Sequence, residues 1–321
     1  MPPTPTLRKA MTYVLVTLLT SWFLLGLFLG TGGNLKTGPG VIFMAIYLAF
    51  PLLAALYLRR SQAMPRPMVI VSLRPLNRWF FLAWLFPLGL GLLAIAVAAA
   101  FPGVVFSTDL DQFYQVLARE GDPTQVDKIR EVLTKIGIHP FWVFLFHAPF
   151  AGATVNAFLV WPEEVGWRSY LLFLTRRMGF WRSGLFIGLM WGLWQTPLVV
   201  LGADNAGIPE ALLVMASAIL LSPLLCFVRI MSGNTLVSAV AHGTFNTATG
   251  LSLLLVHGGD SFMTGLNGLA GVVVLALANL LLLVLLRRPG LRATLATRLS
   301  GLFRPVVRPN RTPAPGPAGQ E

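Results

Sequence analysis

Three short polar segments interrupt apolar stretches of this chain, and they contain side chains that could do chemistry inside a membrane. The segments are 161–168, 191–197 and 241–246, and their polar side chains are Glu163, Glu164, Arg168, Gln195, His242 and Asn246. Ionisable groups are costly in hydrocarbon, so each one is a candidate functional group by default.

The spacing within the first segment separates its two acids. On a helix, Glu164 and Arg168 are four positions apart with the acid first, which favours an ion pair. Glu163 points about 100° away from Glu164 and lacks that partner. An unpaired carboxylate in a poorly hydrated site is suited to act as a general base.

The other two segments carry groups at a matching depth. His242 and Asn246 are four positions apart, so they share a helix face. Gln195 follows a small-residue ridge that allows close helix packing, formed by Gly184, Gly188 and Gly192. Glu163, Gln195 and His242 each lie thirteen residues from an arginine, roughly 20 Å if helical. We expect one polar site, with Glu163 facing His242 across a cavity. A purely structural interpretation, a buried ion pair with helix-linking hydrogen bonds, is also open.

The composition identifies the environment of these groups. Apolar residues make up 55% of the 321 residues and charged ones only 11%, against about 25% in a typical soluble domain. The mean hydropathy is +0.73. The chain is therefore predicted to be an all-α, polytopic membrane protein, which excludes soluble enzymes and transcription factors. The single cysteine, Cys226, excludes a disulfide framework.

Apolar runs of sufficient length predict about eight transmembrane helices. They are Met11–Leu29, Val41–Leu58, Trp79–Phe101, Pro140–Val160, Leu185–Leu201, Ala211–Val228, Thr235–Val256 and Thr264–Leu286. The stretch from Pro140 to Arg176 is too long for one span, so we expect a break, with Pro162 as the candidate position.

The net charge of +12 indicates how the chain is oriented in the membrane and does not indicate nucleic-acid binding. No nucleic-acid partner is therefore expected. Eighteen of the 24 basic residues fall on one side of the predicted spans, in the segments 8–9, 59–78, 176–182, 229 and 287–311. The positive-inside rule makes that side cytoplasmic and places both termini there. We expect a multi-pass protein of the cell membrane, the cytoplasmic membrane of a bacterium.

Five regions follow from this pattern. Residues 1–101 hold three transmembrane helices, and 102–139 form an outer loop whose helical spacing predicts short amphipathic helices. Residues 140–256 form the helix core that carries the polar segments, and 257–288 hold the last span. Residues 289–321 are a basic, then Pro-rich tail, whose first part is expected on the anionic inner leaflet.

At the polar segments the sequence resembles the CPBP family of intramembrane proteases, which includes the CAAX prenyl endopeptidases. The family motif Glu-Glu-x-x-x-Arg matches Glu163, Glu164 and Arg168, and its His-x-x-x-Asn motif matches His242 and Asn246. The second motif normally reads Phe-x-x-x-His. Here Trp191 and Gln195 occupy those two positions, inside a Gly-Leu-Trp run followed by Pro197.

The resemblance implies an endopeptidase that cleaves a membrane-associated, possibly lipidated, protein or peptide. In that mechanism Glu163 is the general base, Glu164 with Arg168 orients it, and His242 with Asn246 forms the oxyanion site. In the metalloprotease version, a divalent ion such as zinc would be held by Glu163, Glu164 and His242.

Two further hypotheses are open, and the first rests on Gln195. An amide can orient water but cannot take up a proton, and it is a poor zinc ligand. The protein could therefore be a catalytically impaired relative that binds a membrane partner. The third hypothesis is a transporter that uses Glu163 and His242 as a proton relay; the sequence has no inverted repeat to favour it.

Overall fold

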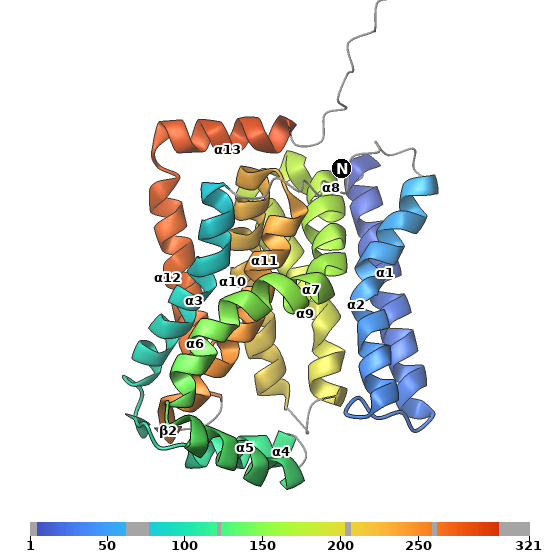
Figure 1. The fold of residues 1–321 in the computed structure, drawn as a ribbon. Coiled ribbons are helices and arrows are strands. Elements are labelled where there is room, and N and C mark those ends of the chain that lie inside the picture. Colours follow the sequence, from blue (N-terminus) through green and yellow to red (C-terminus); the bar gives the residue numbers. More distant parts are fainter. Residues whose placement is uncertain (1–4, 62–76, 121–122, 203–206, 259–261, 302–321) are drawn as a thin grey trace, which may run out of the picture.

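A computed structural model of the chain describes residues 5–61, 77–120, 123–202, 207–258 and 262–301, and these form a helical bundle (Figure 1). Three long helices come first: α1 (Pro5–Gly30), α2 (Gly38–Ser61) and α3 (Arg78–Ala98). After the central region come α9 (Phe180–Gly202), α10 (Ile208–Ser232), α11 (Thr235–Ala248) and α12 (Leu269–Leu285). Large apolar side chains such as Phe23, Phe146 and Phe158 point outward, as expected for a lipid-facing surface.

The number of spans differs from the eight predicted. Among the described residues, six helices are long and apolar enough to cross a membrane, or seven if α12 and α13 (Pro289–Gly301) form one broken span. The predicted span Thr235–Val256 is instead the 14-residue helix α11, then a 3₁₀ segment η4 (Thr249–Leu254) and a short strand. Most of α11 is buried against protein, so it need not match the thickness of the bilayer.

The stretch from Pro140 to Met178 does not break at Pro162, which corrects the prediction. It is one helical run of 39 residues. Its parts are α6 (Pro140–Ala151), η1 (Gly152–Asn156), α7 (Ala157–Glu164), η2 (Val165–Leu171), α8 (Leu172–Thr175) and η3 (Arg176–Met178). The segments η1 and η2 are π-helical, and such wider turns allow a helix to bend without ending. Figure 1 shows α6 rising obliquely, α7 crossing the bundle and α8 turning upward.

Glycines allow two close helix contacts in the bundle. On α9, the predicted ridge Gly184, Gly188 and Gly192 faces α10, and a Cβ at Gly188 would lie 2.6 Å from the Cα of Ile219. On α11, Gly243 meets the backbone of Gly152 in η1. The small-residue ridge is therefore confirmed as a close-packing surface, and a second one joins α11 to the 140–178 run.

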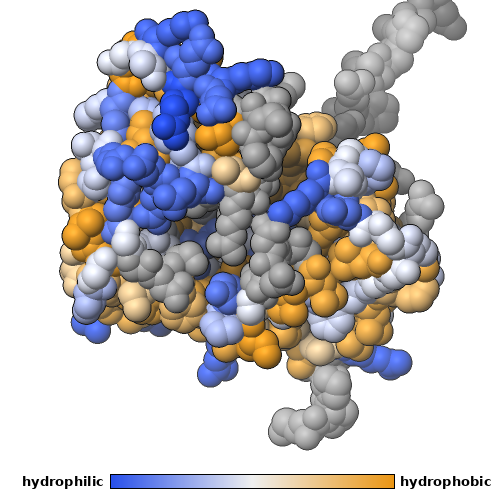
Figure 2. All heavy atoms as spheres, turned by 90° about the horizontal axis from the view of Figure 1, so that it is seen from below, coloured by the Kyte–Doolittle hydropathy of each residue, from blue (hydrophilic) through white to orange (hydrophobic). Residues whose placement is uncertain are grey.

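The outer loop contains the two short amphipathic helices that were predicted, α4 (Asp111–Glu120) and α5 (Pro123–Ile136). One feature was not predicted: β1 (Val104–Phe106) in this loop pairs antiparallel with β2 (Val256–Gly258), which follows η4. Figure 2 looks at this end of the bundle, where hydrophilic side chains gather over one part and hydrophobic ones surround them.

The start of α1 and the helix α13 lie together at the opposite end of the bundle (Figure 1). There α12 ends, and α13 is bent from it by 102°. The tail residues 302–321, for which a Pro-rich extension was predicted, lie outside the described residues.

Candidate active site

A buried ion pair and a histidine meet where α7 passes into the π-helical segment η2. Nη1 of Arg168 donates to Oε1 of Glu164 at 3.0 Å, which confirms the predicted pairing of these two residues. Nδ1 of His242, from α11, lies 3.0 Å from the same oxygen. Glu164 and Arg168 are fully buried and His242 is 2% exposed. A carboxylate that faces a guanidinium stays ionised, so it accepts from both partners.

Glu163 has a different environment from its neighbour. Its side chain is 1% exposed, and its Oε2 accepts a hydrogen bond of 2.9 Å from Nε1 of Trp191 on α9. Among the described residues, this indole is the only hydrogen-bond donor to Glu163. Glu163 is thus held in place through one oxygen, while its other oxygen can accept a hydrogen bond from a further group.

Trp191 connects all of these side chains. Its ring lies edge-on to the imidazole of His242, with 4.9 Å between centroids, and the guanidinium of Arg168 sits 4.2 Å above its face. Nε and Nη2 of Arg168 are buried without a hydrogen-bond partner among the described residues. The face of the indole therefore supplies part of the stabilisation that this buried cation needs.

The contact between His242 and the acids adds a partner to one expectation. Glu163 was predicted to face His242 across a cavity. The imidazole is hydrogen-bonded to Glu164, and Trp191 contacts both Glu163 and His242, so the cavity between these two stays a prediction. The two acids are nevertheless separated as the helical spacing indicated, one paired with Arg168 and one turned toward another helix.

Gln195 and Asn246 stand apart from this group. Gln195 lies one turn beyond Trp191 on α9, half-buried, and its amide has no hydrogen bond to any described residue. Asn246 lies one turn beyond His242 on α11, but it is exposed while His242 is buried. The structure therefore brings together Glu163, Glu164, Arg168 and His242, and neither amide is hydrogen-bonded to them within the described chain.

Two residues of this region have contacts that the sequence analysis did not predict. Trp191 had a usable signal, because it stands four residues before Gln195 at a motif position. Arg229 was assigned to the cytoplasmic basic residues, whereas it is fully buried at the end of α10, and its Nε donates to Ser169 at 3.3 Å. Ser169 also shares a hydrogen bond of 2.8 Å with Thr235, so this arginine lies within a polar junction of three helical segments.

The side chains do not suit the metal site that was considered. Within the described residues, no three His, Cys, Asp or Glu side chains are arranged to hold a metal ion. Oε1 of Glu164 and Nδ1 of His242 are bonded to each other, and the cation of Arg168 lies beside them. A divalent ion there would face a guanidinium, and the repulsion between the two cations disfavours its binding.

Comparison with protein-family models supports one family. Residues 133–248 match the model described as Rce1-like, type II CAAX prenyl endopeptidase Rce1-like. This part of the chain is an Rce1-like domain of the CPBP intramembrane proteases. The Rce1-like domain runs from the end of α5 through α11, so it includes every residue of the site. Searches of curated proteins and of solved structures returned no match to the chain.

The domain assignment fixes what the site belongs to. The matched model describes a prenyl endopeptidase, and the chain around the domain is a multi-pass membrane protein. Helices α1 to α3, α12 and α13 lie outside the matched region. They cover the Rce1-like domain on several sides, as the contacts of α11 with α3 and of α10 with α12 indicate.

Proposed function

We propose that this protein is an intramembrane endopeptidase in which Glu163 is the general base. The observation that supports this role is the contrast between the two adjacent acids. Glu164 is compensated by Arg168 and His242, whereas Glu163 receives, from the part of the chain that the structure describes, only the indole N–H of Trp191. A carboxylate with one oxygen anchored and one open can bind a water molecule and take its proton.

The proposed reaction is a hydrolysis. The open oxygen of Glu163 takes a proton from water, and the hydroxide attacks the carbonyl carbon of the scissile peptide bond. The tetrahedral intermediate then collapses with cleavage of the C–N bond, and Glu163 passes the proton that it took from water to the leaving amine, which restores the carboxylate. These steps need no redox partner, so every atom of the products comes from the peptide and one water molecule.

His242 is assigned to the stabilisation of charge on the intermediate. Because Glu164 only accepts, Nδ1 of His242 must carry the proton of their hydrogen bond. Nε2 is then the nitrogen that meets the substrate, and the ionised Glu164 supports a positive charge on the ring. Glu164 and Arg168 are thus positioning residues, and Trp191 fixes the rotamer of Glu163.

The substrate is proposed to be a membrane-associated protein or peptide, in the cytoplasmic membrane with α13 on the cytoplasmic side. The basic residues at the α13 end support that orientation. The description of the family model further suggests a prenylated C-terminal peptide as the first substrate class to examine.

The test compares a catalytic variant with a matched surface variant. Purified protein in lipid nanodiscs is incubated with fluorogenic C-terminal peptides, each prepared with and without a prenyl group on cysteine. Glu163→Gln should lower the cleavage rate by about 10²–10⁴-fold, because the general base is lost. Glu131→Gln makes the same chemical change at an exposed residue of α5 and should leave the rate unchanged. Equal cleavage by wild-type protein and E163Q would refute the role of Glu163.

A second candidate, a catalytically impaired relative that binds a membrane partner, is supported by Gln195. This amide replaces the motif histidine and has no hydrogen bond to a described residue. Gln195→His discriminates the two functions. A large gain of cleavage over an inactive wild-type protein supports the impaired relative, whereas an active wild-type protein whose rate falls on this substitution removes it.

A further inference from the structure

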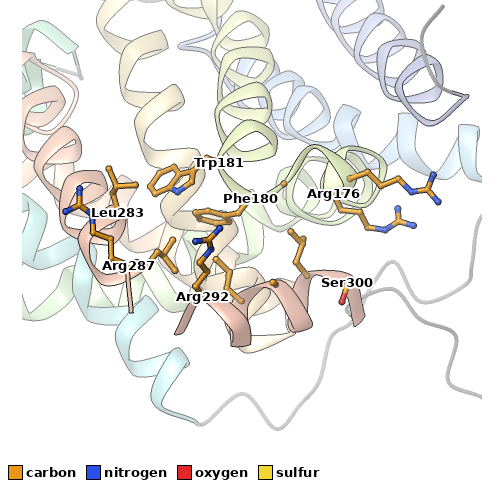
Figure 3. Close-up of a pocket in the computed structure, with 13 residues that line it drawn as sticks. Arg176, Phe180, Trp181, Leu283, Arg287, Arg292 and Ser300 are labelled. Atoms are coloured by element: carbon orange, nitrogen blue, oxygen red, sulfur yellow. The ribbon is translucent and has the colours of Figure 1, made fainter. Parts of the chain in front are cut away.

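A cavity lies at the α13 end of the bundle and includes none of the residues of the candidate active site. It has a volume of about 740 Å³ and is formed where the turn between α8 and α9 meets α12 and α13 (Figure 3). Its apolar lining includes Phe180, Trp181 and Leu283, together with Leu295 and Leu299 from α13. This volume lies within the range of pockets that hold small organic ligands.

The charged part of the lining has one sign. Arg176 and Arg177 come from the start of η3, Arg287 from the turn after α12 and Arg292 from α13, and none of the described residues that line the cavity is acidic. In the described part of the chain, none of the four forms an ion pair with Asp or Glu. Arg176 is partly engaged, since its guanidinium lies 3.9 Å from the ring centroid of Phe173. The other three guanidinium groups are exposed and available to an anion.

The position of α13 indicates at what depth in the membrane the cavity lies. α13 turns by 102° from α12 where the apolar run of α12 ends, which places it across the end of the bundle. Its Leu295 and Leu299 are buried toward the protein, and Arg298 donates to the backbone oxygen of Met231 in α10. Figure 3 shows Arg292 extending from α13 toward Phe180. The arginines therefore lie at headgroup level, beside an aromatic and aliphatic floor.

We propose that this cavity binds an anionic phospholipid. Arg177, Arg287 and Arg292 would hold the phosphate, and the first methylene groups of an acyl chain would pack on Phe180, Trp181 and Leu283. Arginine suits a phosphate because its planar fork donates two hydrogen bonds at once. The apolar floor distinguishes a lipid from free phosphate, which would gain nothing from it. A basic pocket between helix ends at the inner leaflet is a recurrent lipid-binding arrangement.

The test uses phosphatidylglycerol, phosphatidylcholine and inorganic phosphate as probes of the full-length protein in detergent. Native mass spectrometry counts lipids that remain bound as each probe is titrated. Arg287→Gln/Arg292→Gln should weaken phosphatidylglycerol binding by about 30-fold, since each arginine at the surface contributes roughly a fivefold factor. The control pair Arg182→Gln/Arg288→Gln removes two exposed arginines at the same end that do not line the cavity, and it should change binding less than threefold.

Each outcome decides the proposal. A loss of phosphatidylglycerol binding in Arg287→Gln/Arg292→Gln but not in the control pair supports a lipid site, provided that phosphatidylcholine binds more weakly than phosphatidylglycerol. Equal losses in both pairs would show a general surface attraction and would overturn it. Displacement of the lipid by inorganic phosphate at similar concentrations would also overturn it, because the apolar floor would then have no role. Far-ultraviolet circular dichroism confirms that the variants fold.

Discussion

Replacing Trp191 by phenylalanine tests the central contact of the site. The change keeps an aromatic ring against His242 and Arg168 but removes the N–H that donates to Glu163 at 2.9 Å. A hydrogen bond to a charged group contributes about 1.5–3 kcal/mol, and one between neutral groups about 0.5–1.5 kcal/mol. The loss in the free energy of unfolding therefore reports the charge on Glu163.

Trp194 offers a matched control on the same helix. It is also buried, and its Nε1 donates to the neutral hydroxyl of Ser21 at 2.9 Å. Both substitutions remove the same atoms, so the difference isolates the acceptor to a first approximation. When Glu163 is ionised, Trp191→Phe should lower the free energy of unfolding by roughly 1–2 kcal/mol more than Trp194→Phe does.

The assay is equilibrium unfolding in mixed detergent micelles, completed as a double-mutant cycle with Glu163→Gln. In the Glu163→Gln background the cost of Trp191→Phe should fall by about 1 kcal/mol, because the acceptor is then neutral. Cleavage by Trp191→Phe should also fall, by about tenfold or more, since the base loses its orienting donor. Equal unfolding costs in both backgrounds, together with unchanged cleavage, would refute the assigned contact.

Two further substitutions test the buried ion pair and the helix packing around the site by the same unfolding assay. Arg168→Gln should destabilise the protein by about 3–5 kcal/mol, because Glu164 keeps a buried charge without its cation, and adding Glu164→Gln should recover part of that loss. A double variant no more stable than Arg168→Gln would contradict this account. Gly188→Ala should lower the free energy of unfolding by about 1–3 kcal/mol, since its Cβ would lie 2.6 Å from Ile219. As a control, Gly26→Ala on α1 adds a Cβ that meets nothing within 4 Å, so it should be neutral or slightly stabilising. Similar results for both alanines would argue against close packing of α9 on α10.

Local spacing predicted those features that depend on one helix or one apolar face. The four-residue spacing of Glu164 and Arg168 indicated their ion pair, and the ridge at Gly188 indicated a close helix neighbour. The pattern of the outer loop predicted the helices α4 and α5. Such features follow from helix periodicity, which the sequence contains directly.

Features that depend on contacts between helices could not be predicted in the same way. From the sequence, a tryptophan in an apolar run is expected to pack against other helices or to face lipid. Trp191 becomes the donor to Glu163 because α9 approaches α7 in the folded bundle. Arg229 resembled a basic residue at a membrane border until the position of Ser169 showed it to be internal. The continuity of the helix through Pro162 depends on π-helical turns, for which the chain carries no plain local signal.

The shortness of α11 also bears on how the protein is assembled in the cell. A segment of 14 residues that includes a histidine, an asparagine and several hydroxyl groups has too little apolar length to enter a bilayer on its own. Its surroundings are supplied by α3, α6 and α7, which are synthesised earlier. We therefore expect α11 to enter the bundle only after these three helices are in place. A ribosome that stalls before residue 235 would leave the acids of α7 in the membrane without their histidine.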